Sequence, residues 1–302
     1  MIFKKKSSIP KPGDFVMLGD QKTVCLDCSP RGDGKHGIFL INAANKKLVL
    51  KCYGRKRSAW QTLLDNLEHL IVGKSLTWAK TRFKTEKKSL EIWAKHGFDV
   101  FRQPSDSSKI NSPKINIGRP FIIFEYVTGR TALEYFADPK VEHKDKIELL
   151  KQFIPEWNRR HKLAMETQNR YLLQEHPSFK HVFKSNDNRL IYFDFETVYT
   201  PRHSIKALIG REIAGYVRSL IKVVPEKKSK EFLDLIINEY PDTEYLSYPD
   251  FYFFRHPNLL LRLLCAIDRQ MPRHKKRHSK YPVAKLLDER LKFHQDMPGQ
   301  KA

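Results

Sequence analysis

The stretch that decides the fold is QEHPSFKHVFKSNDNRLIYFDFE, residues 174–196. A polar, histidine-bearing loop opens it, and two β-prone runs follow at 182–183 and 190–193. Asn186, Asp187 and Asn188 separate the runs, and such residues are typical of tight turns between strands. The pattern predicts a β-hairpin that ends on the carboxylate of Asp194, on the side of the loop that opened it. An ordinary surface hairpin is the alternative, and the upstream sequence separates the two.

A glycine-rich segment near the N-terminus lies between two predicted strands. Gly32, Gly34 and Gly37 form a G-x-G-x-x-G pattern between β-prone runs at 23–28 and 38–41. Glycines let a backbone turn tightly and bring amide N–H groups close to phosphates. A dinucleotide-binding loop of this pattern opens a helix, whereas a glycine-rich loop between two strands is typical of protein kinases. A plain hairpin tip has the same pattern, so the neighbouring elements decide.

A lysine and a glutamate downstream fit the kinase interpretation. Lys51 closes the apolar run 48–50, close to the V-A-I-K pattern in which the lysine neutralises the α- and β-phosphates of ATP. In the helical pattern of residues 82–97, Glu86 falls on one apolar stripe with Trp93. A carboxylate inside an apolar stripe needs a cation, and Lys51 is the partner that we predict. The alternative is a Glu86 that lies in water at the edge of the stripe.

The rest of the sequence supplies the other elements that a kinase-like fold requires. The apolar run 120–127 predicts a strand, and in kinases such a strand leads into the hinge, whose backbone binds adenine; here Glu125 and Val127 would do so. A plain core strand has the same appearance. Residues 144–165 are amphipathic at helical spacing, and residues 204–295 are mostly helical in pattern. Glycine loop, strand lysine, helix glutamate, hinge-like strand, long helix, histidine loop and hairpin aspartate occur in the order of a protein kinase.

These features predict an α+β fold, protein-kinase-like and two-lobed. We expect a small, β-rich N-lobe over residues 1–126 and a larger, mainly helical C-lobe over residues 127–302. The chain has 302 residues, 40% of them apolar or aromatic, which is enough for one large core or two modest cores.

The net charge is +22, and the basic excess is spread along the whole chain. Such a field attracts polyanions, which include nucleic acid, anionic lipid head groups and phosphorylated substrates. Nucleic acid is disfavoured because the sequence has no zinc-finger spacing, no RNP-type strand and no interleaving of aromatic with basic residues. The basic N-terminus lacks the apolar run of a signal peptide, and no stretch has the ~18 to 20 apolar residues of a membrane span. We expect a soluble, cytoplasmic protein.

Near the C-terminus, an apolar run at 258–267 precedes a basic cluster at 273–278. The combination suits peripheral docking on an anionic membrane. The alternative, which we favour for the helix, is a core helix of the C-lobe with a solvated basic edge. The basic cluster also suits RNA, and the sequence leaves the oligomeric state open.

The motifs together resemble the bacterial lipopolysaccharide kinases over roughly residues 20–225. Those enzymes have a kinase-like fold and phosphorylate heptose or Kdo sugars of the lipopolysaccharide inner core from the cytoplasmic side. The resemblance implies ATP and Mg²⁺ as cofactors, Lys51 and Glu86 as the ATP-positioning pair, Asp194 as a metal ligand and His181 as the second. It rests on the three glycines, Lys51, Glu86, FIIFEYVTG (121–129), HPSFKHVF (176–183), IYFDFE (191–196) and REIAGYVRSL (211–220).

The loop 174–181 departs from the family. Its members carry an Asp that orients and deprotonates the acceptor hydroxyl, five residues before a metal-binding Asn or His. Here that position holds His176, or Ser178 if the loop is two residues shorter, and Glu175 is the nearest carboxylate. His176 is able to act as a base near neutral pH, so these three residues are the catalytic candidates.

The sequence thus predicts a transferase, an ATP-dependent kinase acting on a sugar hydroxyl of lipopolysaccharide inner core or a related glycolipid. We expect it at the inner face of the cytoplasmic membrane, with an anionic glycolipid as substrate and peripheral contact with anionic lipid. One alternative is a pseudokinase, a nucleotide-binding scaffold in cell-envelope assembly that lacks the catalytic Asp. Another is a basic adaptor that uses the fold as a rigid platform.

Overall fold

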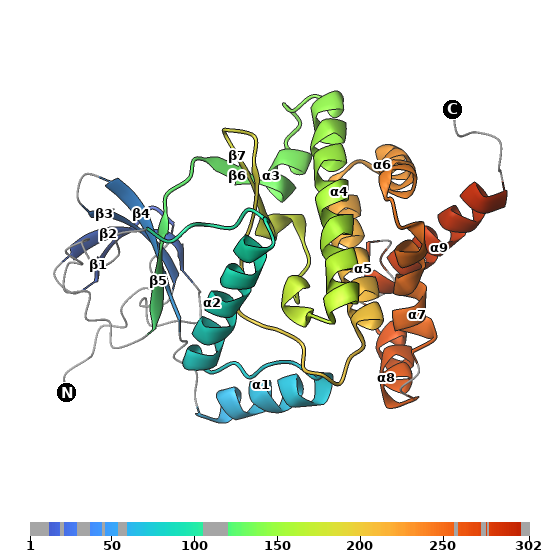
Figure 1. Cartoon of the computed structure of the whole chain (residues 1–302), viewed down its shortest axis with the longest axis horizontal. Coiled ribbons are helices and arrows are strands. Elements are labelled where there is room, and N and C mark those ends of the chain that lie inside the picture. The colour runs from blue at the N-terminus through green and yellow to red at the C-terminus, as the bar shows by residue number, and fades with distance from the viewer. Residues whose placement is uncertain are drawn as a thin grey trace. The chain divides into compact units, whose positions relative to one another are not determined.

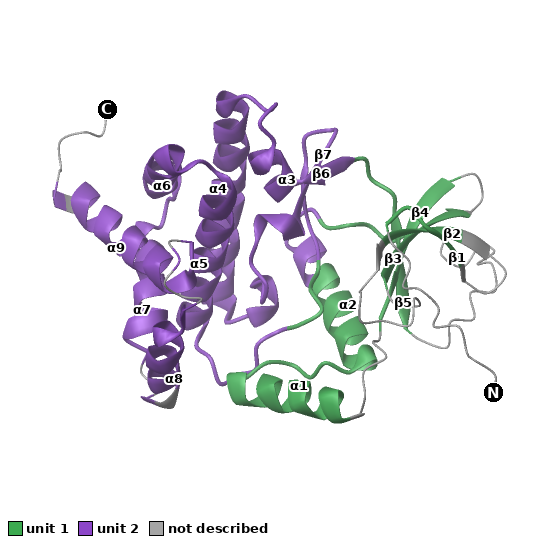
Figure 2. Cartoon of the chain, turned by 180° about the vertical axis from the view of Figure 1, so that it is seen from behind, with its two compact units in different colours: residues 1–91, 100–128, 194–197 green, residues 92–99, 129–193, 198–302 purple. Residues whose placement is uncertain are grey.

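The computed structural model describes residues 12–18, 21–28, 37–43, 46–53, 59–104, 120–256, 259–272, 276 and 278–296. The chain forms two compact units, shown in Figure 2. Unit 1 comprises residues 1–91, 100–128 and 194–197, and unit 2 comprises residues 92–99, 129–193 and 198–302. The segment 194–197, directly after the predicted hairpin, therefore belongs to the unit built mainly from the N-terminal part of the chain.

Unit 1 contains a five-stranded antiparallel sheet whose strands follow chain order (Figure 1). On β4, Leu48, Leu50 and Cys52 alternate into a core shared with Phe39 and Ile41 of β3. Because successive side chains of a strand point to opposite faces, Lys51 lies on the other face of β4. The strands are β1 (Phe15–Leu18), β2 (Gln21–Cys28), β3 (Gly37–Ala43), β4 (Lys46–Cys52) and β5 (Phe121–Glu125).

Two helices lie between β4 and β5 in the chain, α1 (Ala59–Val72) and α2 (Ala79–Lys95). The last turn of α2 belongs to unit 2. The helix α2 covers the pattern predicted around Glu86. It ends where Phe98 N–H donates to the Trp93 carbonyl (3.0 Å) and Gly97 adopts a φ of +72°, the left-handed ending that favours glycine. Glu86 is buried and Glu91 is exposed, so the interpretation of Glu86 as a solvated edge residue is wrong.

Unit 2 is mainly helical, with a small sheet of three strands. Three aromatic rings pack together in this unit, Phe153 of α4 (His143–Thr167), Phe179 of η2 (Phe179–His181) and Tyr216 of α5 (Ile205–Val223). Their centroids are 4.8–5.2 Å apart. Its helices are α3 (Ala132–Ala137), α4 (His143–Thr167), α5 (Ile205–Val223), α6 (Glu226–Glu239), α7 (Tyr248–Phe254), α8 (Leu259–Gln270) and α9 (Lys280–Asp296). The short 3₁₀ helices are η1 (Arg170–Leu172), η2 (Phe179–His181) and η3 (Thr243–Ser247), and the strands are β6 (Gly129–Thr131), β7 (Val182–Ser185) and β8 (Leu190–Tyr192).

The predicted hairpin forms as β7 and β8. Val182 pairs with Tyr192 and Phe183 pairs with Ile191 in antiparallel register. Asn188 adopts a φ of +65° in the turn, a conformation that asparagine tolerates better than most residues. After β8, the N–H of Phe193 donates to the His181 carbonyl (3.2 Å), which ties the end of the hairpin to the loop that precedes it.

The helix α8 is not the core helix that we favoured from the sequence. Leu259, Leu263 and Ile267 are 68%, 57% and 51% exposed. Only its other side is anchored, where Cys265 packs against the cluster of Ala214, Phe253, Tyr281 and Ala284. Apolar periodicity located the helix, but periodicity does not tell which side of a stripe meets protein.

The α+β class predicted from the sequence is confirmed: an antiparallel sheet near the N-terminus is followed by a mainly helical region, in the order of a protein-kinase-like fold. Among the described residues, no helix combines the length and the apolar character needed to cross a membrane.

Candidate active site

The ammonium group of Lys51 lies at the centre of a charged cluster in unit 1. Its Nζ is 2.9 and 2.7 Å from the two carboxylate oxygens of Glu86, 3.3 Å from Asp194 Oδ1 and 3.0 Å from Glu196 Oε1. The Lys51 side chain is only 12% exposed. Burial alone would lower the pKa of Lys51, but the charges of Glu86 and Asp194 outweigh burial and raise it above the ordinary value. Lys51 is therefore a cation shared by three carboxylates from two parts of the chain, α2 and the segment 194–197.

Glu86 is held from a second side by Tyr53, which donates a hydrogen bond of 2.5 Å to Glu86 Oε2. Tyr53 follows Lys51 by two residues and so points to the same side of the chain. Burial, and then the charge of Glu86, raises the pKa of Tyr53, so the phenol remains a donor. Its ring lies edge-on to Phe83 of α2, at a centroid distance of 5.7 Å. The buried carboxylate thus has both a cation and a neutral donor.

We expect Tyr53→Phe to destabilise unit 1 by about 1.5–3 kcal/mol, because a buried carboxylate loses one hydrogen bond while its ion pair remains. The measurement is urea unfolding of the full chain. Tyr126→Phe removes a hydroxyl from a residue that is 40% exposed in the same unit and is the matched control. Equal unfolding midpoints for the two variants would show that the Tyr53 hydroxyl contributes nothing.

Asp194 has an unusual backbone conformation, with a φ of +69°. Residues other than glycine seldom adopt this left-handed region, and such strain is concentrated at functional sites. Its side chain is 29% exposed, more than those of Glu86 and Glu196 at 2% and 15%. Asp194 is the carboxylate of the cluster with the most room for a ligand.

Glu196 and Arg82 belong to the same cluster, although neither was predicted from the sequence. Glu196 bridges Lys51 and Arg82, because its second carboxylate oxygen pairs with the Arg82 guanidinium. Arg82 precedes Glu86 by one helical turn, and Glu196 follows Asp194 by two residues. The spacings i,i+4 on a helix and i,i+2 in an extended segment would have indicated both residues. The pair fastens the segment 194–197 to α2 within unit 1.

The cluster fits Mg²⁺ and ATP in its donor chemistry. Mg²⁺ is usually held by one or two carboxylates together with substrate phosphates, rather than by an all-protein cage. Asp194 and Glu196 supply two carboxylates beside a lysine suited to phosphates. The described residues hold no group of three or more His, Cys, Asp or Glu arranged for a metal ion. A Mg²⁺ held by Asp194 would take its other ligands from phosphates or water.

The predicted phosphate loop and hinge are seen in part. Gly32 and Gly34 lie outside the described residues, and Gly37 opens β3 with a φ of +150°. Glu125 ends β5, and its N–H donates to the Arg102 carbonyl (2.9 Å), so this N–H is not available to an adenine ring. Val127 follows β5 and is half-buried. The adenine-binding role of Glu125 and Val127 remains a prediction.

In unit 2, Glu175 and His176 form a carboxylate–imidazole dyad. The Glu175 carboxylate is 2% exposed, and its Oε2 lies 2.7 Å from Nε2 of His176, whose side chain is 62% exposed. Arg211 of α5 holds the other carboxylate oxygen at 3.3 Å and lies over the Tyr199 ring at 4.9 Å. A buried carboxylate this close to an exposed imidazole holds the ring near one orientation.

A buried network fixes the backbone that carries this dyad. Arg160 donates to the Leu172 carbonyl (2.7 Å) and pairs with Glu212, and Glu212 accepts from the Gln174 N–H (3.0 Å). Gln174 itself bonds to the Tyr216 hydroxyl and to the Phe193 carbonyl. Burial alone would raise the pKa of Glu212, but Arg160 and His161 outweigh burial, so the pKa lies below its ordinary value. Gln174 therefore serves to hold the loop and not to react.

The loop also sits against α5 at Gly215. A Cβ at this position would lie 2.4 Å from Pro177 Cγ, so only glycine allows the approach. Ser178 caps η2, because its side chain accepts from the Lys180 N–H (3.4 Å), which makes it a structural residue in this loop. His181 ends η2, is buried, and lies edge-on to Phe193 at 5.7 Å. Its role as a second metal ligand stays a prediction.

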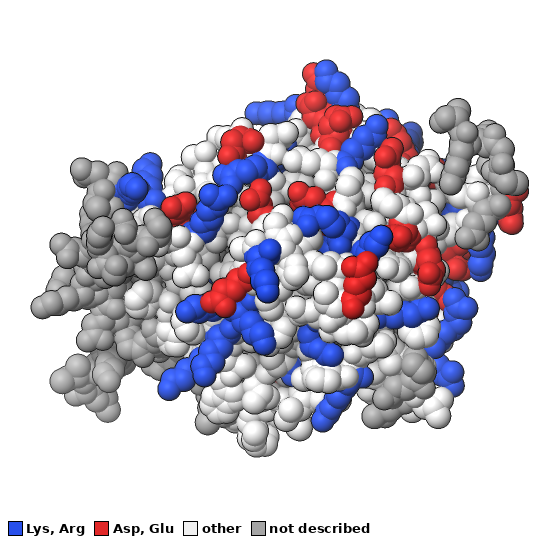
Figure 3. All heavy atoms as spheres, in the orientation of Figure 1, with Lys and Arg blue, Asp and Glu red and all other residues white. Residues whose placement is uncertain are grey.

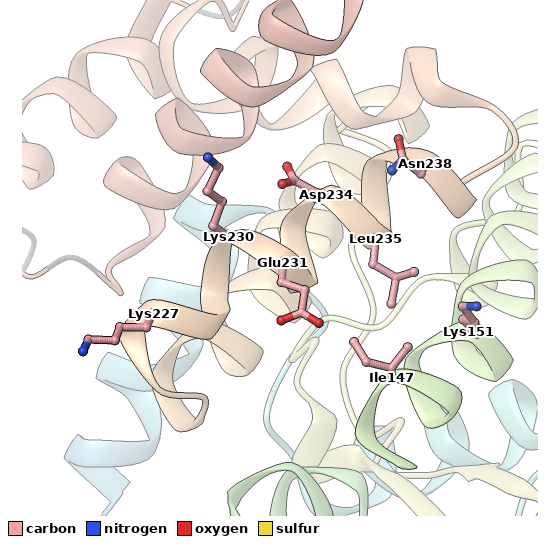
Figure 4. Close-up of a pocket in the computed structure, with 8 residues that line it drawn as sticks. All are labelled: Ile147, Lys151, Lys227, Lys230, Glu231, Asp234, Leu235 and Asn238. Atoms are coloured by element: carbon pink, nitrogen blue, oxygen red, sulfur yellow. The ribbon is translucent and has the colours of Figure 1, made fainter. Parts of the chain in front are cut away.

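A hollow of about 540 Å³ lies between α4 and α6 in unit 2, away from these residues (Figure 4). Figure 4 shows Lys227 and Lys230 extending away from Ile147 and Leu235. The acidic side chains there have partners, since Glu231 pairs with His143 (2.6 Å) and Asp234 with Arg290. The hollow contains none of the predicted site residues.

No protein-family model and no curated sequence matches this chain. Solved structures do: an apo pseudokinase has 13% identity over 84% of this chain and 86% of its own, with a TM-score of 0.37. The pseudokinase drought responsive inactive kinase 1, bound to ENMD-2076, has 12% identity over the same shares of the two chains, with a TM-score of 0.34. At these values no residue's role is transferred from either protein.

Proposed function

We propose that this chain is an ATP-dependent kinase that phosphorylates a sugar hydroxyl of the lipopolysaccharide inner core or of a related glycolipid. The observation that carries the proposal is the Lys51 ammonium, which is held by Glu86 and lies 3.3 Å from Asp194. A lysine fixed by a helix carboxylate next to a metal-binding aspartate is the shared requirement of phosphoryl transfer in kinases. ATP, when bound, supplies the γ-phosphoryl group, and Mg²⁺ neutralises charge on its phosphates.

In this proposal, the residues of unit 1 bind and orient the nucleotide. Lys51 faces the phosphates, and Glu86 and Tyr53 keep it in place. Asp194 holds the metal, and the Arg82–Glu196 pair keeps the segment of Asp194 in position. Positioning and neutralisation of charge account for most of the catalysis of phosphoryl transfer.

His176 is the proposed base. Its imidazole would accept the proton of the acceptor hydroxyl when that hydroxyl reacts. Glu175 then stabilises the imidazolium through its 2.7 Å contact with Nε2. This dyad replaces the aspartate that the lipopolysaccharide kinases carry in the loop, and it retains a buried carboxylate one residue away.

The acceptor class comes from the sequence resemblance and from charge. Inner-core sugars are anionic glycolipid groups, and a chain with a net charge of +22 attracts them. We place the protein at the inner face of the cytoplasmic membrane, with peripheral contacts to anionic lipid. The exposed apolar side of α8, which the basic cluster 273–278 follows in the sequence, is one surface that supports such contact.

A pseudokinase is the second candidate, and two observations favour it. The loop 174–181 has no Asp in any register, and Lys51 is already engaged by three carboxylates. Such a protein would bind nucleotide and organise partners in envelope assembly without phosphoryl transfer.

Incubation with Mg²⁺, radiolabelled ATP and purified core oligosaccharide separates the two candidates. The kinase proposal predicts label in the oligosaccharide, and thermal stabilisation by ATP. Stabilisation by ATP with no transfer to any core acceptor would support the pseudokinase. If ATP neither stabilises the protein nor labels the oligosaccharide, both candidates are excluded.

We expect His176→Ala to reduce acceptor phosphorylation by about 10²-fold or more, because a positioned general base contributes at this scale. Nucleotide affinity should not change. His143→Ala is the matched control, because His143 also pairs with a glutamate at 2.6 Å in unit 2 but lies outside the loop. If His176→Ala and His143→Ala phosphorylate the acceptor at equal rates, His176 is not the base.

A further inference from the structure

Helix α1 has an inverted distribution of polar and apolar residues. Six large apolar side chains point outward, and they share one stripe of the helix at spacings of three and four residues. Its half-buried or buried side instead carries polar residues, including Asp65, Asn66 and His69. The outward set is Trp60 (66% exposed), Leu63 (57%), Leu64 (46%), Leu67 (51%), Leu70 (47%) and Ile71 (56%).

The inward polar side is anchored by specific contacts and is not an accident of helix rotation. Asn66 Oδ1 accepts from both the N–H (2.8 Å) and the hydroxyl (3.0 Å) of Thr77. His69 Nδ1 contacts the Ser75 carbonyl at 2.6 Å. These bonds fix α1 to the segment that leads into α2. Turning the stripe inward would break them, so the apolar stripe of α1 stays on the exposed side of the helix.

The sequence around the stripe is basic. Between positions 55 and 84 the sequence has seven Lys or Arg residues and two acidic residues. Lys80 is exposed beyond the end of α1, as is Trp78 (55%). Figure 3 shows blue Lys and Arg side chains over much of the face that it draws, with fewer red Asp and Glu side chains among them. Exposed tryptophan, leucines and nearby lysines are the composition of helices that lie in a membrane interface.

We propose that α1 docks in the plane of an anionic lipid bilayer, with its apolar stripe buried in the interface. Charge decides between this occupant and a second copy of the chain. Two copies, each with a net charge of +22, repel one another, whereas anionic head groups attract each of them. The inference is independent of phosphoryl transfer, since lipid binding needs neither nucleotide nor acceptor.

The test is binding of the full chain to phosphatidylcholine vesicles with and without phosphatidylglycerol. The variant is Leu63→Gln/Leu67→Gln, which replaces two exposed side chains and should leave the thermal midpoint unchanged. Phe15→Gln is the matched control, because Phe15 is an exposed apolar residue (66%) on β1 of the same unit. Wild type and Phe15→Gln should bind the anionic vesicles, and the double variant should bind at least about tenfold more weakly, because each leucine withheld from lipid costs about that factor.

Tryptophan fluorescence gives a second readout. Trp60 and Trp78 are exposed, whereas Trp93 and Trp157 are buried. Brominated lipid should therefore quench wild type, and Trp60→Phe should lose most of that quenching. Vesicle binding that the double variant retains in full would overturn the proposal. So would a wild type that ignores vesicles but is dimeric by light scattering, with a monomeric double variant, because α1 would then be an interface between copies.

Discussion

Lys51→Ala and Asp194→Ala should each lower Mg²⁺-dependent ATP turnover by at least about 10²- to 10³-fold, the usual effect of removing one preorganised electrostatic group. Lys51 supplies the positive charge for the phosphates, and its ion pair with Glu86 (2.7 Å) keeps it in place. Asp194 is the more exposed carboxylate beside it and the proposed metal ligand. The measurement is acceptor-dependent release of ADP at saturating and at low nucleotide.

Glu91→Gln is the control for this experiment. Glu91 lies on the same helix as Glu86 but is exposed, so the substitution removes an α2 carboxylate without touching the cluster. Thermal unfolding of Lys51→Ala shows whether the protein is destabilised when the buried Glu86 loses its cationic partner. Turnover in folded Lys51→Ala or Asp194→Ala at the level of Glu91→Gln would remove the kinase proposal.

Arg160→Met should destabilise the protein by about 3–5 kcal/mol, because it leaves the fully buried Glu212 without its cation. This loss is larger than the one expected for Tyr53→Phe. Burial would lower the pKa of Arg160, but the charge of Glu212 outweighs it and raises that pKa, so the two groups are ionised together. Trp93 lies 4.6 Å from the guanidinium and reports unfolding of unit 2 by its fluorescence. Loss of the Leu172 contact should also loosen the loop with Glu175 and His176.

A double-mutant cycle isolates this ion pair. Glu212→Gln keeps an acceptor for the Gln174 N–H but carries no charge, so Arg160→Met/Glu212→Gln should recover part of the loss seen in Arg160→Met. The folded-state pKa of Glu212 lies below its ordinary 4.5, so its contribution to stability is present above that value and is lost as pH falls through the folded pKa. Variants with Glu212→Gln should lack this component of acid sensitivity. Additive effects in the cycle would contradict a coupled pair.

Much of the arrangement around Lys51 is predictable from periodicity. Lys51 at the end of an apolar strand run and Glu86 on the stripe of a helix indicate a buried ion pair, and the two residues lie in contact. Tyr53, Arg82 and Glu196 were missed, although each is at strand or helix spacing from a predicted residue. Polar residues at such spacings are common, and only the fold shows which of them converge on one ammonium.

The exposed helices show what periodicity cannot supply. The apolar stripe of α8 looked like a core face, yet Leu263 is 57% exposed. For α1 the inward side is identified by contacts such as that between Asn66 and Thr77, which joins the helix to the segment that follows it. A stripe in the sequence shows that a helix is two-sided, and the rest of the fold decides which side meets protein.

The most direct test of the central claim is calorimetric titration with ATP, with and without Mg²⁺, for wild type and Asp194→Asn. Asparagine has nearly the same shape and tolerates a φ of +69°, so the backbone should be unaffected. We predict that Mg²⁺ strengthens ATP binding to wild type and that this gain is lost in Asp194→Asn, while Mg²⁺-free binding persists. An equal gain from Mg²⁺ in both proteins would contradict a metal site at Asp194.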